Sequence, residues 1–249
     1  MPFGLIIIGD EILSGKREDK HFPAIRDRLA ARGLRLDWSL ILGDDRARLT
    51  ETLHRSFASP DVVFCCGGIG ATPDDHTRQA AAAALGVPLV LHPDAERLIA
   101  ERSAEVGLEL TPGRLRMGEF PEGARIIPNP VNRIPGFAIR DHWFVPGFPA
   151  MAWPMLEWVL DQHYADRFHA QPHAELGMRV HGLAEATLTP LFEAIEATWV
   201  GVKIFSLPRL NDTPGGYDIE LGVKGDPALI DAAFARLREG VQALGGRIA

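Results

Sequence analysis

The chain contains little cysteine: two residues in 249, Cys65 and Cys66, which are adjacent. Neighbouring residues of a strand point to opposite faces, so this pair has no metal-site spacing and offers no disulfide framework. Few cysteines and no disulfide framework fit a reducing compartment, and we therefore expect a cytoplasmic protein.

Long apolar runs and an excess of basic residues are missing as well. The first hydrophobic run, residues 5–8, is far too short to cross a bilayer and follows no basic leader, so it predicts a strand rather than a signal sequence. The net charge is −7, from 26 basic and 33 acidic residues, which argues against non-specific binding to nucleic acid or acidic membranes. We expect neither as a partner, although this charge is compatible with a local basic pocket.

A strand followed by a glycine turn is the most informative stretch of the sequence. Residues 62–66 form a short apolar run typical of a buried strand, and Gly67, Gly68 and Gly70 follow it. Glycines allow a sharp turn and close approach to a ligand, and the helix predicted at 78–85 adds free N–H groups and a positive dipole end. This arrangement favours an anionic ligand, usually phosphate. It matches neither the dinucleotide-binding G-x-G-x-x-G spacing nor the Gly-Lys-Ser/Thr of a P-loop.

Acidic residues stand beside these glycines and after the second strand. Asp74 and Asp75 would repel a bare phosphate, so they suggest a bound cation of the Mg²⁺ type, a group to be deprotonated, or helix capping. Asp44 and Asp45 could equally form the acidic first turn of the next helix. Another polar loop, residues 9–15, follows the first strand at the sheet edge where open α/β folds bind ligands.

The alternation of strand-like and helix-like segments predicts an α/β fold with a doubly wound, mostly parallel sheet over residues 1–164. A linker is expected at 165–174 and a small α+β domain at 175–249. In the first domain we expect strands at 5–8, 34–42, 62–66, 87–91 and 126–127 and a hairpin at 137–145. Helices are expected at 22–33, around 49–57, and at 78–85, 93–106 and 151–164. The segment 107–124 is expected to be irregular. In the second we expect strands at 176–180, 202–207 and 217–223, helices at 188–197 and 227–244, and a turn at 211–216. The first helix of the first domain, residues 22–33, is expected to bury Phe22, Ile25 and Leu29 on one stripe.

Four motifs give the chain a resemblance to a known family. They are Gly9-Asp10-Glu11-Ile12-Leu13-Ser14-Gly15, Gly43-Asp44-Asp45, the glycine turn at 67–77, and Val145-Pro146-Gly147-Phe148-Pro149. In order and spacing they resemble the molybdopterin-binding fold family, which includes MogA, MoaB and the N-terminal part of CinA, over residues 4–160. Residues 179–185 are similar to the small domain that follows this fold in CinA. Because the chain stops there, the amidohydrolase domain of longer CinA proteins is expected to be absent.

Two departures from the family pattern bear on the choice of ligand. The common glycine-rich form has Thr where this chain has Ile69, which removes one hydroxyl from the phosphate loop. CinA-like proteins usually carry Asp-Thr/Ser-Asn where this chain has Glu18-Asp19-Lys20-His21, and that segment looks more like the Glu-Asp-Lys run of MogA.

The resemblance implies a pocket across the C-terminal ends of the first and third strands. Asp44 and Asp75 align with acidic residues implicated in adenylyl transfer and are the candidate catalytic residues. Candidate ligands of Mg²⁺ or another divalent cation are Asp10, Asp44, Asp74 and Asp75. The bound molecule, molybdopterin or an adenine nucleotide, is expected to contact Gly9, Asp10, Glu11, Ser14, Gly15, Lys20, Gly67, Gly68, Gly70, Thr72, Pro146 and Gly147. Asn132 and Arg133 are candidates for contact with a base or pterin ring.

Three functions are compatible with these residues. The CinA resemblance implies a metal-dependent pyrophosphatase acting on ADP-ribose or FAD-like substrates. The MogA-like segment implies molybdopterin binding or adenylylation in molybdenum cofactor biosynthesis. The third function is ligand binding without turnover, which the carboxylates disfavour, since a pure phosphate binder gains nothing from them. The ligand in each case is a small phosphate-bearing molecule, and relatives of this fold lead us to expect a homo-oligomer, a dimer or trimer.

Overall fold

The computed structural model describes residues 1–170, 174–210 and 217–249. Part of the predicted linker and the turn predicted at 211–216 lie outside the described residues. The chain divides into two compact units, Met1–Phe168 and His169–Ala249. Among the described helices, none has the length and apolar character needed to cross a membrane.

The first unit is built on a six-stranded sheet with the strand order β2-β1-β3-β8-β7-β6. Its strands are β1 (Phe3–Ile8), β2 (Leu36–Leu42), β3 (Val62–Cys66), β6 (Arg125–Ile127), β7 (Gly136–Ile139) and β8 (His142–Val145). The first four in spatial order are parallel, and β7 and β6 continue the sheet antiparallel. Strands β1 and β3 are buried along their whole length, which explains why both are uninterrupted apolar runs rather than alternating ones.

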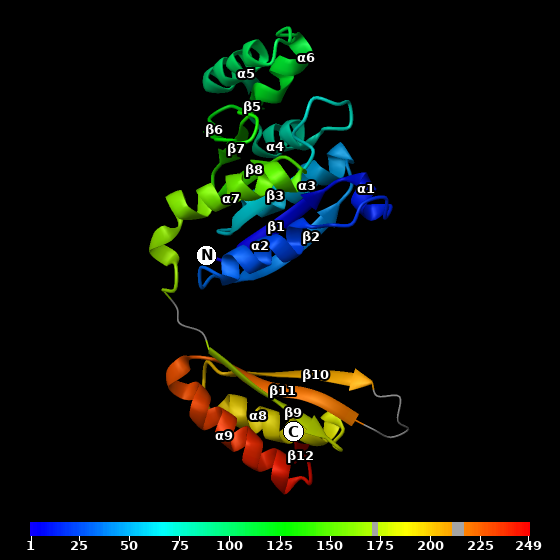
Figure 1. Ribbon diagram of the computed structural model, residues 1–249, viewed down its shortest axis with the longest axis vertical. Helices are drawn as coiled ribbons and strands as arrows, with labels where there is room; N and C mark the ends of the chain where they lie inside the picture. Colours follow the sequence, from blue (N-terminus) through cyan, green and yellow to red (C-terminus); the bar gives the residue numbers. More distant parts are fainter. Residues whose placement is uncertain (171–173, 211–216) are drawn as a thin grey trace. The chain divides into compact units, whose positions relative to one another are not determined.

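Helices cover both faces of this sheet (Figure 1). Helices α2 (His21–Ala30) and α7 (Pro149–His163) pack on one face with Phe64 and Cys66 of β3, and α3 (Arg46–Phe57) and α4 (Thr77–Leu85) pack on the other with Val63 and Cys65. The alternation of neighbouring β3 side chains between the two cores follows from the two-residue period of a strand. The prediction of a doubly wound, mostly parallel α/β fold is confirmed.

The buried stripe of α2 differs from the prediction. Phe22 is 39% exposed, whereas His21, Ile25 and Leu29 are buried. These three residues are spaced four apart and lie on one face of the helix, and Phe22, about 100° from His21 around the helix axis, lies at the edge of that face. The prediction for Phe22 was wrong because a histidine takes the place of an apolar residue at the start of the stripe.

An excursion beyond the sheet replaces the irregular segment predicted at 107–124. Strand β4 (Leu89–Leu91) pairs antiparallel with β5 (Glu119–Pro121) in a separate two-stranded sheet, so it is not the fourth strand of the main sheet as expected. Between them lie α5 (Pro93–Glu105), the single-turn helix α6 (Pro112–Leu115) and the 3-10 helix η1 (Arg116–Gly118), at one end of the first unit (Figure 1). The α6 turn begins where the Thr111 side chain accepts a hydrogen bond from the Arg114 N–H.

Two other short helices occur where the sequence indicated loop or linker. Helix α1 (Asp10–Leu13) occupies most of the loop predicted at 9–15. The 3-10 helix η2 (Ala165–Arg167) lies in the predicted linker, and Arg167 donates a hydrogen bond to the carbonyl of Met1. This contact, together with the packing of Phe168 on the α2/α7 core, ties η2 to the first unit.

The second unit is a two-layer α+β structure. Its described elements are β9 (Ala174–His181), α8 (Glu185–Thr198), β10 (Lys203–Leu210), β11 (Tyr217–Gly225), α9 (Pro227–Ala243) and β12 (Arg247–Ile248). The strand order β10-β11-β9-β12 with antiparallel pairing is the βαββαβ arrangement of ferredoxin-like domains. The predicted small α+β unit is confirmed, and β12 is an additional strand whose two residues are too few for a recognisable pattern.

The core of the first unit gives a test of this packing. Leu156 of α7 is 1% exposed, so we expect Leu156→Ala to lower the free energy of unfolding by about 2–5 kcal/mol through lost burial and a cavity. Leu13→Ala is the matched control: Leu13 is 59% exposed, and its change is expected within about 0.5 kcal/mol. Urea unfolding followed by tryptophan fluorescence measures both. Equal losses in the two variants would contradict the assignment of α7 to the core.

Candidate functional site

Four loops follow β1, β2, β3 and β8 at one edge of the sheet, because the C-terminal ends of parallel strands meet there. The Gly9 N–H donates to the carbonyl of Leu42 at the end of β2, and the Gly67 N–H donates to that of Val145 at the end of β8, both over 3.0 Å. A Cβ added to Gly147 would lie 3.3 Å from the Cα of Gly67. The structure thus brings together the four motif loops that hold the candidate residues.

Asp10 and Asp44, at the ends of β1 and β2, are joined by two hydrogen bonds, each from the backbone N–H of one residue to the carboxylate of the other. The Asp10 N–H donates to Oδ2 of Asp44 over 2.9 Å, and the Asp44 N–H donates to Oδ1 of Asp10 over 3.2 Å. Gly43 is needed for this approach, because a Cβ there would collide with the Asp10 carboxylate. The neighbouring Asp45 has a different role: its carboxylate accepts a hydrogen bond from the Arg48 N–H and caps α3. The alternative of an acidic first turn for Asp44 and Asp45 was therefore wrong, because Asp45 is the cap of α3 and the first turn of that helix contains no acidic residue.

The environment of Asp44 disfavours its negative charge. Partial burial raises the pKa of the Asp44 carboxyl, and the carboxylates of Asp10, Glu11 and Asp74 raise it further, while the hydrogen bond from the Asp10 backbone lowers it. Like charges that are gathered at one edge of a fold, with a perturbed pKa, mark a functional site more often than a structural one.

The glycine turn after β3 is shaped by two close approaches. Gly67 has φ 114°, and a Cβ there would collide with the Ile8 carbonyl oxygen at the end of β1. The first residue of α4, Thr77, donates its hydroxyl to the Gly67 carbonyl over 3.0 Å and its N–H to the Gly68 carbonyl over 3.0 Å. The Gly67 N–H already donates to the Val145 carbonyl. Gly67 therefore does not supply the free N–H donor that was expected to bind phosphate. Within the described residues, no hydrogen bond uses the N–H of Gly68 or Gly70, so these two remain candidate phosphate donors.

Asp75 braces this turn from its far side. Its Oδ2 accepts hydrogen bonds from the N–H and the hydroxyl of Thr72, and its N–H donates to the Thr72 carbonyl over 3.1 Å. A Cβ on Gly70 would come within 2.5 Å of the same carboxylate oxygen. Asp74, in contrast, is exposed. The Thr72 hydroxyl and the Asp75 carboxylate are thus hydrogen-bonded to each other.

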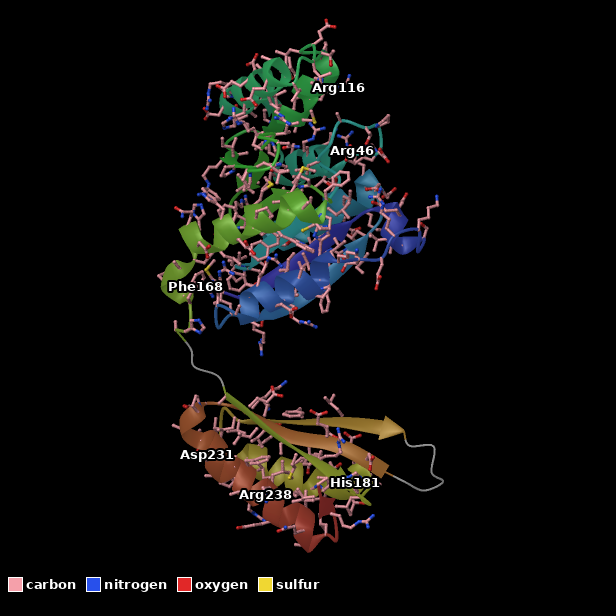
Figure 2. The ribbon with its side chains drawn as sticks, viewed as in Figure 1. Arg46, Arg116, Phe168, His181, Asp231 and Arg238 are labelled. Atoms are coloured by element: carbon pink, nitrogen blue, oxygen red, sulfur yellow. The ribbon has the colours of Figure 1, made fainter. Side chains whose placement is uncertain are left out.

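Arg78 is a buried residue of the site that sequence reasoning missed. It is 2% exposed and donates to the carbonyl of Gly70 over 2.6 Å and to that of Arg116 in η1, which is labelled in Figure 2. Burial lowers the pKa of the guanidinium, against the opposing effect of Glu119 and Asp75. Arg78 therefore fastens the glycine turn to the excursion. Its position in an alanine-rich helix carries no sequence signal for this role.

His21 is a second residue that the sequence did not identify. Its ring is 5% exposed, and Nε2 lies 3.1 Å from the carbonyl of Gly147. A carbonyl only accepts, so Nε2 carries the proton of this contact. Burial lowers the pKa of His21, more than the Gly147 carbonyl and Asp19 raise it, so the ring is neutral near pH 7. The signal in the sequence was its four-residue spacing from Ile25 on the buried stripe.

The remaining candidates lie around this edge with fewer contacts. Lys20 is exposed and immediately precedes α2, and Ser14 and Gly15 are exposed after α1. Arg133 forms an ion pair with Glu105, and the Asn132 side-chain amide lies 3.1 Å from the sulfur of Met151. These contacts engage both residues proposed to meet a base or pterin ring.

The acidic side chains at this edge are the residues that would hold the expected cation. Across residues 1–170, 174–210 and 217–249, no three His, Cys, Asp or Glu side chains are placed to hold a metal ion between them. The protein alone therefore does not form a closed cage from Asp10, Asp44, Asp74 and Asp75. The paired carboxylates of Asp10 and Asp44 do fit Mg²⁺, which keeps several waters and uses one or two carboxylates together with phosphate oxygens. The catalytic, ligand-binding and metal assignments all stay predictions.

Comparison with known proteins identifies the family. Residues 4–165 match the family described as "Probable molybdopterin binding domain". A CinA-like protein of Citrifermentans bemidjiense is 35% identical over 197 residues, which are 78% of this chain and 47% of that protein. A protein of Metallosphaera sedula is 29% identical over 255 residues, 98% of this chain and 96% of that protein. The crystal structure of CinA from Thermoplasma acidophilum, titled as a protein of unknown function, has a TM-score of 0.58 at 27% identity and covers 65% of this chain and 98% of that one.

The family match contains all four loops of the site, and the relatives confirm the resemblance to CinA. The chain spans about half the length, or less, of the curated CinA-like relatives it matches. By the match over residues 4–165, the chain belongs to the molybdopterin-binding domain family and is similar to CinA-like proteins within it.

Proposed function

We propose that the first unit binds a phosphate-bearing nucleotide together with a divalent cation and hydrolyses its phosphoanhydride bond, with ADP-ribose and FAD as model substrates. The observation that carries this proposal is the mutual hydrogen bonding of Asp10 and Asp44 at the sheet edge beside the glycine turn. Partial burial disfavours the negative charge of Asp44, and the nearby carboxylates of Asp10, Glu11 and Asp74 add repulsion. A cation bound between them and a phosphate would relieve it.

In this proposal, different residues of the site bind the phosphate and the cation. The N–H groups of Gly68 and Gly70 and the positive end of the α4 dipole would bind phosphate oxygens, and Lys20 would add a mobile positive charge. Asp10 and Asp44 would hold the cation. When bound, Mg²⁺ neutralises charge on the transferred phosphoryl group and orients the attacking water. Asp75, which accepts both Thr72 bonds, keeps the turn in shape and is better described as a positioning residue than as a base.

A second candidate function is molybdopterin binding or adenylylation in molybdenum cofactor biosynthesis. It is favoured by the description of the matching family and by the Glu18-Asp19-Lys20 segment, which is similar to MogA. Both candidates need a phosphate group at the glycine turn. They differ in the ring attached to it and in whether a phosphoanhydride is cut or formed. A homo-oligomer remains part of this proposal.

The charge of Asp44 predicts an effect on stability with a definite sign. Because the folded state raises the pKa of Asp44, ionising it costs the folded state more than the unfolded one, and this cost disappears as the pH falls through the folded pKa. We expect Asp44→Asn to be as stable as wild type or more stable at pH 7 in EDTA, and the difference to vanish at pH 3, since Asn keeps an oxygen to accept the Asp10 N–H.

Urea unfolding at the two pH values measures this effect. Asp45→Asn is the matched control, because Asn caps a helix as well as Asp does, and its change is expected within about 0.5 kcal/mol. A clear loss of stability in Asp44→Asn at pH 7 would show that the carboxylate charge stabilises the fold and would contradict the interpretation.

Cation-dependent turnover tests the proposed function directly. We expect release of AMP from ADP-ribose or FAD with Mg²⁺, Mn²⁺ or Co²⁺, and a loss of at least about 100-fold in Asp44→Asn, because the metal-held charge would be missing in the transition state. Isothermal titration with AMP should show affinity rising with Mg²⁺ in wild type and in Asp45→Asn, but not in Asp44→Asn. No turnover, with tight binding of a phosphorylated pterin, would favour the second candidate instead.

A further inference from the structure

Phe148 is an exposed aromatic residue in a loop whose backbone is fixed. Its side chain is among the exposed large hydrophobic side chains of the first unit, with 56% of the residue accessible. It lies between Pro146 and Pro149, whose rings restrict the backbone on either side. Its carbonyl accepts hydrogen bonds from the N–H groups of Met151 and Ala152, over 3.0 and 2.9 Å, in the first turn of α7. The exposure of the ring therefore does not result from a loose loop.

The loop is also held against the proposed phosphate site. His21 contacts the carbonyl of Gly147, the residue before Phe148, and Gly147 packs against Gly67 at the start of the glycine turn. Consecutive Cα atoms are about 3.8 Å apart, so the backbone of Phe148 lies one short step from a residue in contact with Gly67. The backbone of Phe148 is therefore held beside the start of the glycine turn.

The loop before β7, which contains Val131 and Asn132, lies beside the first turn of α7. The contact of Asn132 with Met151 places the loop before β7 beside the first turn of α7, and Val131 of that loop is 54% exposed. The polar side chains next to it, Asn132 and Arg133, are already engaged by Met151 and Glu105. Val131 and Phe148 are thus two exposed apolar side chains on the two segments that this contact joins.

We propose that Phe148 is a stacking platform for the planar heterocycle of the phosphate-bearing ligand, an adenine or a pterin ring. This inference rests on the proposed function and adds a specificity element to it: the glycine turn selects phosphate, and Phe148 selects a ligand in which an aromatic ring is joined to that phosphate. A ring held by a rigid loop loses little freedom on stacking, which makes it an effective contact. Stacking tolerates different heterocycles because each has a π-face.

Isothermal titration with three probes, each with Mg²⁺, tests the inference: AMP, neopterin phosphate, and ribose 5-phosphate, which has no ring. In Phe148→Ala we expect about a tenfold loss of affinity for the better-bound ring-bearing probe, the loss typical of one base–aromatic stack, and no change for ribose 5-phosphate. Phe148→Tyr keeps the ring and should bind as wild type does. Leu108→Ala is the control, since Leu108 is also exposed, at 48%, and lies between α5 and α6, outside the four loops of the site. Upfield shifts of the ring protons of the bound probe, present in wild type and lost in Phe148→Ala, would support a direct stack.

Three outcomes would overturn the inference while leaving the proposed function in place. Wild type could bind the ring-bearing probes and ribose 5-phosphate with equal affinity, or Phe148→Ala could lose affinity equally for all probes. The third outcome is a change of oligomeric state in Phe148→Ala with unchanged affinity for the ring-bearing probes. Wild type that binds none of the three probes would overturn both. Because the Phe148 side chain is exposed and forms no hydrogen bond that caps α7, Phe148→Ala is expected to fold, and circular dichroism checks this.

Discussion

The packing of Gly67 against the end of β1 is the constraint on which the candidate site depends. Its positive φ and the proximity of the Ile8 carbonyl leave no room for a side chain, so glycine is needed for both conformation and space. The same residue donates to Val145 at the end of β8 and packs against Gly147. One residue thus sets the separation of three strand ends. A wider spacing here would move the glycine turn away from the carboxylates of the neighbouring loop.

Charge at this edge is arranged differently from charge in the rest of the unit. Arg78, although buried, donates from both terminal nitrogens to backbone carbonyls, and these contacts fix the turn. Asp10 and Asp44 also accept hydrogen bonds from backbone N–H groups, but at Asp44 partial burial and neighbouring carboxylates outweigh this donor, and the pKa of Asp44 stays raised. At this edge the fold does not offset the repulsion between carboxylates. Such a site is expected where a bound ligand supplies the missing positive charge.

The sequence predicted the parts of this site that depend on local order and missed those that depend on distant contacts. Buried strands and glycine turns have short-range patterns, whereas the capping role of Asp45 was not predicted. The apolar run of β4 looked like the other strands, because a run does not specify its partner, and β5 was too short to be recognised. His21 contacts a carbonyl 126 residues away and Arg78 one 38 residues away, so no local pattern identifies either.

The coexistence of a phosphate-binding turn and several carboxylates follows from coupling between their ligands. Two carboxylates are too few to hold a divalent cation tightly, and a phosphate beside four acidic residues is repelled when no cation is present. In the proposed binding mode each ligand supplies what the other lacks, so the cation raises the affinity for phosphate and, by reciprocity, phosphate raises the affinity for the cation by the same factor. An incomplete metal site in the protein alone is therefore what this mode requires, since a complete one would bind the cation regardless of substrate and remove the coupling.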